Sequence, residues 1–331
     1  MNWQWLLIGV GSVVGAALAG FVALYVSTGG DYKVPETVVD DESLPSVTVN
    51  GYQFHAETFG SPENQTVIVL HGGPGGDYRS LLSLKALSDG YFVVFYDQRG
   101  AGLSERVPAE DLTLEEYLKD LDAFVNKFGD GNVVNLIGHS WGAHIASAYL
   151  GYAPEKVNKT VLAEPGYLNA EEKREWDEFY KSLLSGIDYT WYSIRAGFAA
   201  QHVDGPDKYA PEDFLVGQRI LPYFLNHPDN PYHCPGEKYT APSWRFGSTA
   251  SEAVLNNASR DDLNSLSDHA SSYEKPVLFI AGECNTWIGP SLQEKHAKLY
   301  PNARLEVISD AGHDTFWDNP EETIEVIRSF L

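Results

Sequence analysis

Hydrophobic and polar positions after residue 45 form short apolar runs that alternate with helical patterns. Four runs are typical of buried strands, and helical patterns occupy residues 79–88, 113–128 and 141–151 between them. Strands that alternate with helices indicate an α/β protein with a doubly wound, mostly parallel sheet. Ahead of them, two alternating stretches flank Asn50-Gly51, which predicts a β-hairpin over Val47–Phe59. The four predicted strands are Thr66–Leu70, Tyr91–Tyr96, Asn132–Ile137 and Thr160–Ala163.

The alternation stops after Glu164 and returns near Pro276. Residues 167–270 are rich in aromatic residues and prolines and contain no convincing strand. Strands are predicted again at Pro276–Ala281 and Arg304–Ile308, with helices over 291–299 and 320–331. We therefore expect one core, formed by residues 46–166 and 271–331, with an inserted subdomain at 167–270.

The N-terminal segment has a different pattern, because Trp5–Val26 is a run of 22 residues without a charge. About 20 apolar residues are needed for a helix to cross a bilayer. We therefore predict a single-pass transmembrane anchor over residues 1–27, followed by an acidic tether at 28–45. A cleaved signal peptide is the alternative, because Ala17–Ala19 resembles a cleavage site. Residues 1–4, however, contain no Lys or Arg.

The short N-terminal tail is most simply retained inside the cell, which would place the soluble domain outside the cytoplasm. Gly11 and Gly15 form a GxxxG pair through which two such helices could associate into a homodimer. Small residues in an ordinary span are the simpler interpretation of that pair.

The net charge and the cysteine content limit the classes of function that the chain can have. The formal net charge is −23, and such a field repels phosphate backbones, which excludes a nucleic-acid-binding role. Cys234 and Cys284 have no metal-ligand spacing and form no disulfide framework. We expect neither a metal nor another cofactor.

Gly138-His139-Ser140-Trp141-Gly142 forms a G-x-S-x-G motif between a predicted strand and a predicted helix. In this context the glycines allow a sharp turn, and the serine hydroxyl projects at the positive end of the helix. The motif therefore predicts that Ser140 is a nucleophile. The alternative is a tight turn in which Ser140 only caps the helix.

Two further loops follow predicted strands. His71–Gly76 reads HGGPGG and offers exposed backbone amides, so the amides of Gly73 and Trp141 could together hold an oxyanion. A phosphate-binding loop is disfavoured because no Lys-Ser or Lys-Thr follows, and His71 is interpreted as structural. Gly312-His313-Asp314 follows the last strand, which makes His313 the candidate general base.

Together, HGGPGG, Asp97–Ser104 (DQRGAGLS), GHSWGA and AGHDTFWDNP resemble the α/β-hydrolase superfamily, and more narrowly its proline iminopeptidase group. The resemblance implies that the insertion is a helical cap that closes the site and holds the amino end of the substrate. It also implies that Asp97 and Arg99 brace their loop, as an arginine–carboxylate pair beneath the site would.

The sequence departs from this group at the third catalytic residue. The group carries an Asp after the strand before the last one, where this chain has Asn285, and an amide cannot stabilise an imidazolium by charge. We predict that Glu164 replaces it, because the loop after Thr160–Ala163 ends on the same edge of the sheet. Glu283 and Asn285 itself remain alternatives.

These residues favour a serine hydrolase that cleaves small esters or N-terminal aminoacyl bonds of short peptides. A non-catalytic binding or receptor protein with the same fold is the alternative. An aminopeptidase needs a carboxylate for the substrate ammonium, and spacing alone does not select one from the insertion. The candidates there are Glu171, Glu172, Glu175, Asp177, Glu178, Asp204, Asp207, Glu212 and Asp213.

Overall fold

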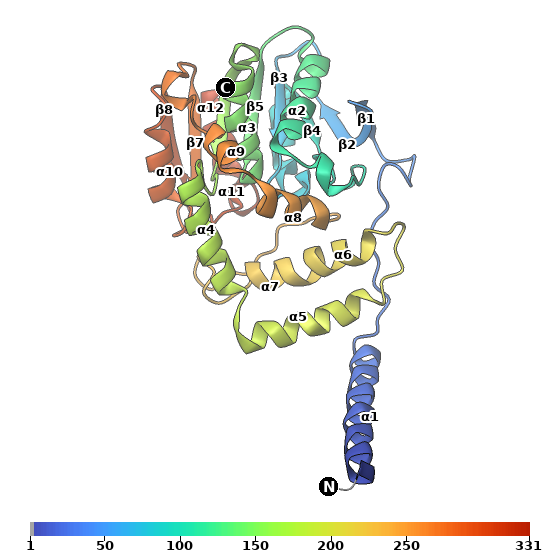
Figure 1. The fold of residues 1–331 in the computed structure, drawn as a ribbon. Coiled ribbons are helices and arrows are strands. Elements are labelled where there is room, and N and C mark those ends of the chain that lie inside the picture. Colours follow the sequence, from blue (N-terminus) through green and yellow to red (C-terminus); the bar gives the residue numbers. More distant parts are fainter. Residues whose placement is uncertain (1–2) are drawn as a thin grey trace.

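An eight-stranded sheet forms the centre of the computed structural model, which describes residues 3–331, with side chains from residue 13 onward. The strand order is β1-β2-β4-β3-β5-β6-β7-β8, and only the pairings of β2 with β1 and β4 are antiparallel (Figure 1). The predicted α/β fold with a mostly parallel sheet is confirmed. The strands are β1 Ser46–Val49, β2 Tyr52–Phe59, β3 Thr66–Leu70, β4 Phe92–Tyr96, β5 Val134–His139, β6 Val157–Ala163, β7 Val277–Gly282 and β8 Ala303–Ile308.

Helices cover both faces of the sheet because successive strand residues point in opposite directions. In β3, Ile68 and Leu70 belong to a cluster that includes residues of α2 (Leu114–Gly129) and α3 (Trp141–Tyr152). Val67 and Val69 belong to the opposite cluster, with the 3₁₀ helix η1 (Tyr78–Asp89) and α12 (Pro320–Phe330). The remaining short elements of the core are η2 Ala109–Asp111, η3 Pro154–Lys156, η5 Ala270–Ser272, α10 Pro290–Ala297 and α11 Thr315–Asp318.

The hairpin of β1 and β2 turns at Asn50 and Gly51, whose φ angles are 50° and 83°. Two consecutive positive φ values define the type I′ turn, whose twist matches that of the flanking strands. The hairpin predicted from Asn50-Gly51 is therefore confirmed.

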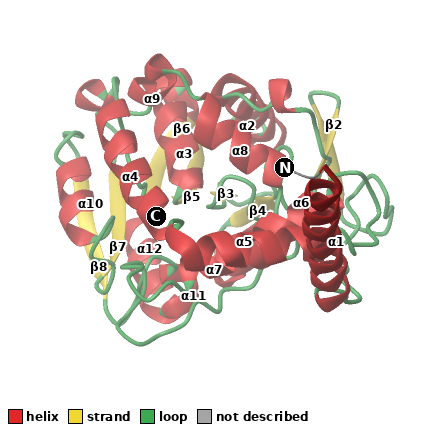
Figure 2. Cartoon of the chain, turned by 60° about the horizontal axis from the view of Figure 1, so that its bottom comes forward, coloured by secondary structure: helices red, strands yellow, loops and turns green. Residues whose placement is uncertain are grey.

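Helices form the insertion, and its described residues contain no strand. Its middle helices lie across the sheet edge where the loops after β3 and β5 emerge (Figures 1 and 2). Its second half returns to the core, where Ala250, Ala253 and Val254 join the cluster on the α2 side. The helices are α4 Ala170–Leu183, α5 Gly186–Ala200, α6 Ala210–Leu215, the π-helical turn η4 Val216–Ile220, α7 Leu221–Leu225, α8 Ser248–Asn257 and α9 Arg260–Ser265.

A 25-residue helix, α1 (Trp3–Ser27), extends from the cap side of the domain. Within the part of the chain that the structure describes, no helix is long and apolar enough to cross a membrane, so the predicted span is not confirmed. Part of that span, and Gly11 of the predicted helix-pairing site, lie outside the residues with described side chains.

Residues 28–45, expected to act as a tether, lie against the cap. Val34 is buried in a small cluster with Ala199 and Phe214, and Tyr32 forms a β-bridge with Val203. Further along, the Val38 amide donates a 2.9 Å hydrogen bond to the Leu103 carbonyl.

The two cysteines form a disulfide, so the expectation that they carry none was wrong. Cys234 lies in the irregular segment after α7, and Cys284 lies two residues after β7. Their Cα atoms are 4.7 Å apart although 50 positions separate them in sequence. The fold, and not a local spacing, brings the two thiols together.

Candidate active site

The G-x-S-x-G motif around Ser140 forms the turn between β5 and α3. Ser140 has φ 52° and ψ −115°, a conformation that side-chain-bearing residues rarely adopt. A Cβ at Gly142 would lie 2.1 Å from the Leu70 carbonyl oxygen, so only glycine fits this close approach of helix to strand. The strained turn holds the Ser140 hydroxyl at the N-terminus of α3.

The glycine loop after β3 lies beside this turn. A Cβ at Gly72 would approach the Ser140 Cβ to 2.9 Å, which shows how closely the two loops pack. Among the described residues, the amides of Gly73 and Trp141 have no acceptor. Both amides are therefore available to an oxyanion formed at Ser140.

His313 is held by its backbone and by its ring. Its amide donates to the Tyr232 carbonyl at 2.7 Å, and its carbonyl accepts from His139 Nε2 at 2.8 Å. The Tyr232 ring stacks on the imidazole with centroids 4.5 Å apart. His313 and Ser140 line the same cavity, although no hydrogen bond joins their side chains within the described chain. Catalytic hydrogen bonds of this kind often shorten only when substrate binds.

Glu164 lies where the carboxylate partner of His313 is required. Its Oε2 is 2.7 Å from His313 Nδ1, and the residue is fully buried. The Gly282 amide donates to Oε1 at 2.8 Å, and Asn285 Nδ2 donates to Oε2 at 2.8 Å. Asn285, at the position where the family's Asp is expected, thus donates to the carboxylate that contacts His313. Glu283 is exposed, and its carboxylate accepts from the Asp310 amide at 3.4 Å.

Burial controls the charge of this pair. It lowers the pKa of His313 to about 3, so the imidazole is neutral at neutral pH and able to accept a proton. Burial raises the pKa of Glu164, and the hydrogen bonds from Gly282 and Asn285 act in the opposite direction.

The loop residues that the sequence indicated as braces do have structural partners. Arg99 makes a two-pronged ion pair with Asp120, at 2.7 and 2.6 Å, and not with Asp97. Asp97 accepts instead from the amide of Leu103 at 2.8 Å and from that of Tyr78 at 3.1 Å. His71 Nε2 accepts from the Gln98 amide at 2.9 Å, as expected of a structural histidine.

The cavity beside Ser140 has core loops on one side and the cap on the other. The cap wall is almost entirely aromatic and aliphatic, and no cap carboxylate lines it among the described residues. The cap residues at this wall are Trp176, Tyr180, Leu221, Phe224, Leu225, Tyr232, Tyr239, Pro242, Ser243, Phe246, Ser251 and Leu255.

The acidic residues of the cap that are buried have partners elsewhere. Glu172 accepts from Lys295 at 2.7 Å and lies 2.9 Å from His296 Nε2. Asp213 pairs with Arg106 and Arg245, at 3.0 and 2.8 Å. These carboxylates stabilise the cap. The family resemblance implies that the cap holds the amino end of the substrate, but neither carboxylate lines this wall.

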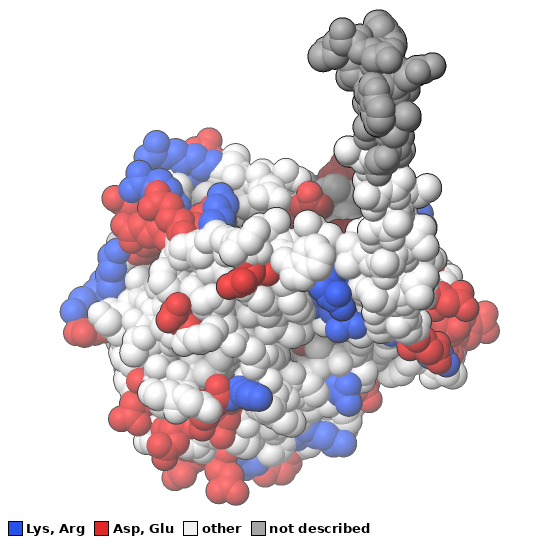
Figure 3. Space-filling view, turned by 90° about the horizontal axis from the view of Figure 1, so that it is seen from below, with Lys and Arg blue, Asp and Glu red and all other residues white. Residues whose placement is uncertain are grey.

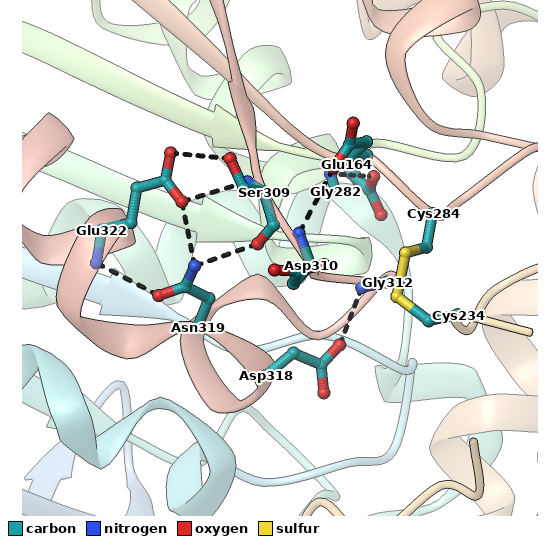
Figure 4. Close-up of a disulfide and its surroundings, with 11 residues drawn as sticks. Glu164, Cys234, Gly282, Cys284, Ser309, Asp310, Gly312, Asp318, Asn319 and Glu322 are labelled. Carbon is teal, nitrogen blue, oxygen red and sulfur yellow. Dashed lines mark hydrogen bonds between the residues drawn. A yellow bond between two sulfur atoms is a disulfide. The ribbon is translucent and has the colours of Figure 1, made fainter.

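The disulfide, which sequence reasoning missed, joins the cap to the catalytic loops. Figure 4 shows it beside the loop at Gly312, and Cys284 comes two residues after Gly282, whose amide donates to Glu164. Two backbone hydrogen bonds run beside it, from Thr286 to Pro231 at 3.1 Å and from His313 to Tyr232 at 2.7 Å. The only available signal was that the chain has two cysteines, one in the insertion and one beside Asn285.

Comparison with known proteins agrees with this geometry. The family profile described as alpha/beta hydrolase fold matches residues 65–320. The chain belongs to the α/β-hydrolase family.

Individual relatives and solved structures show which members of the family this chain is similar to. The chain is 40% identical over 289 residues to a proline iminopeptidase of Saccharolobus solfataricus, covering 81% of this chain and 85% of that protein. It is 27% identical over 267 residues to a proline iminopeptidase of Heyndrickxia coagulans, covering 80% and 90%. The fold is similar to that of an esterase from Thermogutta terrifontis, with a TM-score of 0.59 and 22% identity over 87% of this α/β hydrolase and 96% of the esterase.

Proposed function

We propose that this α/β hydrolase is a membrane-anchored serine hydrolase that cleaves small esters or N-terminal aminoacyl bonds through an acyl-enzyme. The observation that carries the proposal is the 2.7 Å contact of Glu164 with His313, in the cavity that the strained Ser140 borders. A nucleophile, a base and an orienting carboxylate are the parts that acyl transfer requires.

The chemistry follows from these positions. Ser140 Oγ attacks the substrate carbonyl while His313 Nε2 takes its proton, and Glu164 stabilises the imidazolium through Nδ1–H. The amides of Gly73 and Trp141 hold the resulting oxyanion. His313 then gives the proton to the leaving group. In the second half it takes a proton from the water that attacks the acyl-enzyme and returns it to Ser140 Oγ as the acid product leaves.

The alternative, a non-catalytic binding protein, leaves several features without a purpose. A hydrolase fold that has lost catalysis has no need of a strained serine, two free amides and a relocated acid that compensates for Asn285. The cap over the cavity favours small substrates and excludes folded proteins.

The proposal is tested with a panel of 4-nitrophenyl acyl esters and aminoacyl 4-nitroanilides. We expect turnover of at least one substrate class, and loss of kcat by about 10⁴-fold or more in Ser140→Ala. Ser80 also lines the cavity, so Ser80→Ala is the matched control and should retain activity. Activity that survives in Ser140→Ala would contradict Ser140 as the nucleophile. No turnover of any substrate together with no labelling by a serine-reactive probe would favour the binding protein.

Anchoring through α1 is supported by the side chains that it exposes. Val13, Val14 and Leu18 are each more than 60% exposed, and Phe21 contacts Phe198 of α5 with ring centroids 4.9 Å apart. On α5, Ile187, Trp191 and Ile194 are also exposed. Charged side chains are sparse on the face beside α1 and gather toward the rim of that face (Figure 3). A bilayer surface would cover both sets of apolar side chains.

The cysteine pair supports an extracytoplasmic domain, because disulfides persist mainly in oxidising compartments. We expect the full-length protein to require detergent for extraction from membranes. Release by alkaline carbonate or high salt alone would contradict the anchor.

A further inference from the structure

One buried carboxyl at the cavity has no role in the mechanism described above. Asp314 follows His313, lines the cavity and is 8% exposed. Within the described chain its carboxyl oxygens have no hydrogen-bond or ion-pair partner, and only its backbone carbonyl accepts, from Trp317 and Asp318. These oxygens are not among the enclosed side-chain atoms without a partner, so they are open to the cavity, where a ligand can supply one.

The other acid at the cavity wall is fully engaged. Asp77 accepts from the amide of Arg79 at 3.0 Å, from Ser243 Oγ at 2.6 Å and from the Trp244 amide at 2.6 Å. These bonds join the loop after β3 to the cap, and they occupy both oxygens of the carboxylate. Asp77 is therefore structural, and of the two acids that line this cavity in residues 13–331, Asp314 is the one free to meet a ligand.

The surroundings of Asp314 suit a cation. Burial and the nearby acids Asp318 and Glu164 raise the pKa of Asp314 to about 8, and no cation among the described residues offsets them. Tyr232, Tyr239 and Trp176 contribute aromatic faces to the same cavity. The net charge of −23 also favours entry of a cationic substrate.

Position supports the same ligand. The α-amino group of an aminoacyl substrate is two bonds from the carbonyl carbon that Ser140 attacks, so its receptor must lie beside the catalytic residues. Asp314 is adjacent in sequence to the general base and lines the cavity with Ser140. The cap acids do not line this cavity among the described residues.

We propose that the Asp314 carboxylate binds the protonated amino group of an N-terminal aminoacyl substrate, which makes aminoacyl compounds the preferred substrate class. This inference rests on the proposed hydrolase function and selects between its two substrate classes. The ligand is an α-ammonium group beside a scissile carbonyl.

The test uses two amides that differ only in that group, alanyl 4-nitroanilide and propionyl 4-nitroanilide. We expect the wild type to prefer the alanyl compound by on the order of 100-fold in kcat/KM, the effect of losing one buried charged partner. Asp314→Asn should reduce that ratio to near unity. Asp310→Asn changes an exposed carboxylate of the same loop and should keep the wild-type ratio.

A merely structural Asp314 would give an equal loss for both amides and leave the ratio unchanged, which would overturn the proposal. A wild type that cleaves both amides equally would also overturn it, and would identify an acyl hydrolase. Should Asp314→Asn fail to fold, inhibition of the wild type decides: L-alaninol should compete with substrate, and 1-propanol should not. Loss of 4-nitrophenyl propionate cleavage in Ser140→Ala tests the hydrolase function separately.

Discussion

The sheet core and the cap border one cavity but contribute different chemistry to it. Core loops supply the groups proposed for the reaction, Ser140, His313 and Glu164, each on a loop that follows a strand. The cap supplies aromatic and aliphatic walls, and its buried acids are paired with cations away from the cavity. The groups proposed for the chemistry therefore lie on core loops after the strands, whereas the cap shapes the space for a substrate.

The largest effect should come from the core. Glu164→Gln keeps the size of the side chain but removes its charge, and we expect kcat to fall by roughly 10³–10⁴, as loss of the triad acid does in serine proteases. Asn285→Ala removes one donor to that carboxylate and should cost less, about tenfold. Steady-state kinetics on the best substrate of the panel measures both.

Glu283→Gln is the matched control, because Glu283 is exposed and does not contact His313. Near-full activity of Glu164→Gln together with a large loss in Glu283→Gln would contradict the assignment of Glu164 as the acid that orients His313.

A smaller effect should come from the junction of the two regions. The double change Cys234→Ser and Cys284→Ser removes the covalent link between the cap and the loop that carries Asn285. We expect a loss of about 2–4 kcal/mol in the free energy of unfolding. Because Tyr232 and Asn285 support His313 and Glu164, kcat should also fall by several-fold.

Thermal unfolding and kinetics of the double variant, with reduced wild type as the parallel sample, measure these changes. An unchanged kcat in a destabilised variant would show that the disulfide supports only the fold.

The smallest effect is a pH dependence of stability. The pKa of Asp314 is about 8 in the folded chain and about 3.9 when unfolded, so the folded state binds more protons between these values. Stability contributed by this group is therefore lost as pH rises from about 4 to about 8. Asp314→Asn should raise Tm by a few degrees at pH 8.5 and by much less at pH 4.5. Equal shifts at both pH values would contradict the unpaired carboxyl.

The sequence predicted the core more fully than the cap for physical reasons. Fully buried strands such as β3 and β4 leave continuous apolar runs, and Asn50-Gly51 marks its turn because both residues adopt positive φ. The glycines around Ser140 are also a clear signal in the sequence, because a side chain at Gly142 would clash with β3.

Contacts between residues far apart in the sequence have no comparable local pattern that predicts them. The partner of Arg99 is Asp120, on a helix that the loop motif does not include. The disulfide joins residues 50 positions apart, and the pairing of Asp213 with Arg245 and Arg106 depends on how the cap returns to the core. Glu164 was within reach of sequence reasoning because adjacent parallel strands end on one edge, which β6 and β7 do.

Ser140 is proposed to be an activated nucleophile whose base is oriented by the relocated acid Glu164. Labelling with a fluorophosphonate probe, followed by mass analysis of the peptide that contains Ser140, tests this proposal. We expect one covalent adduct on Ser140 in the wild type, none in Ser140→Ala, and much slower labelling in Glu164→Gln. Rapid labelling at another residue, or equal rates for the wild type and Glu164→Gln, would contradict it.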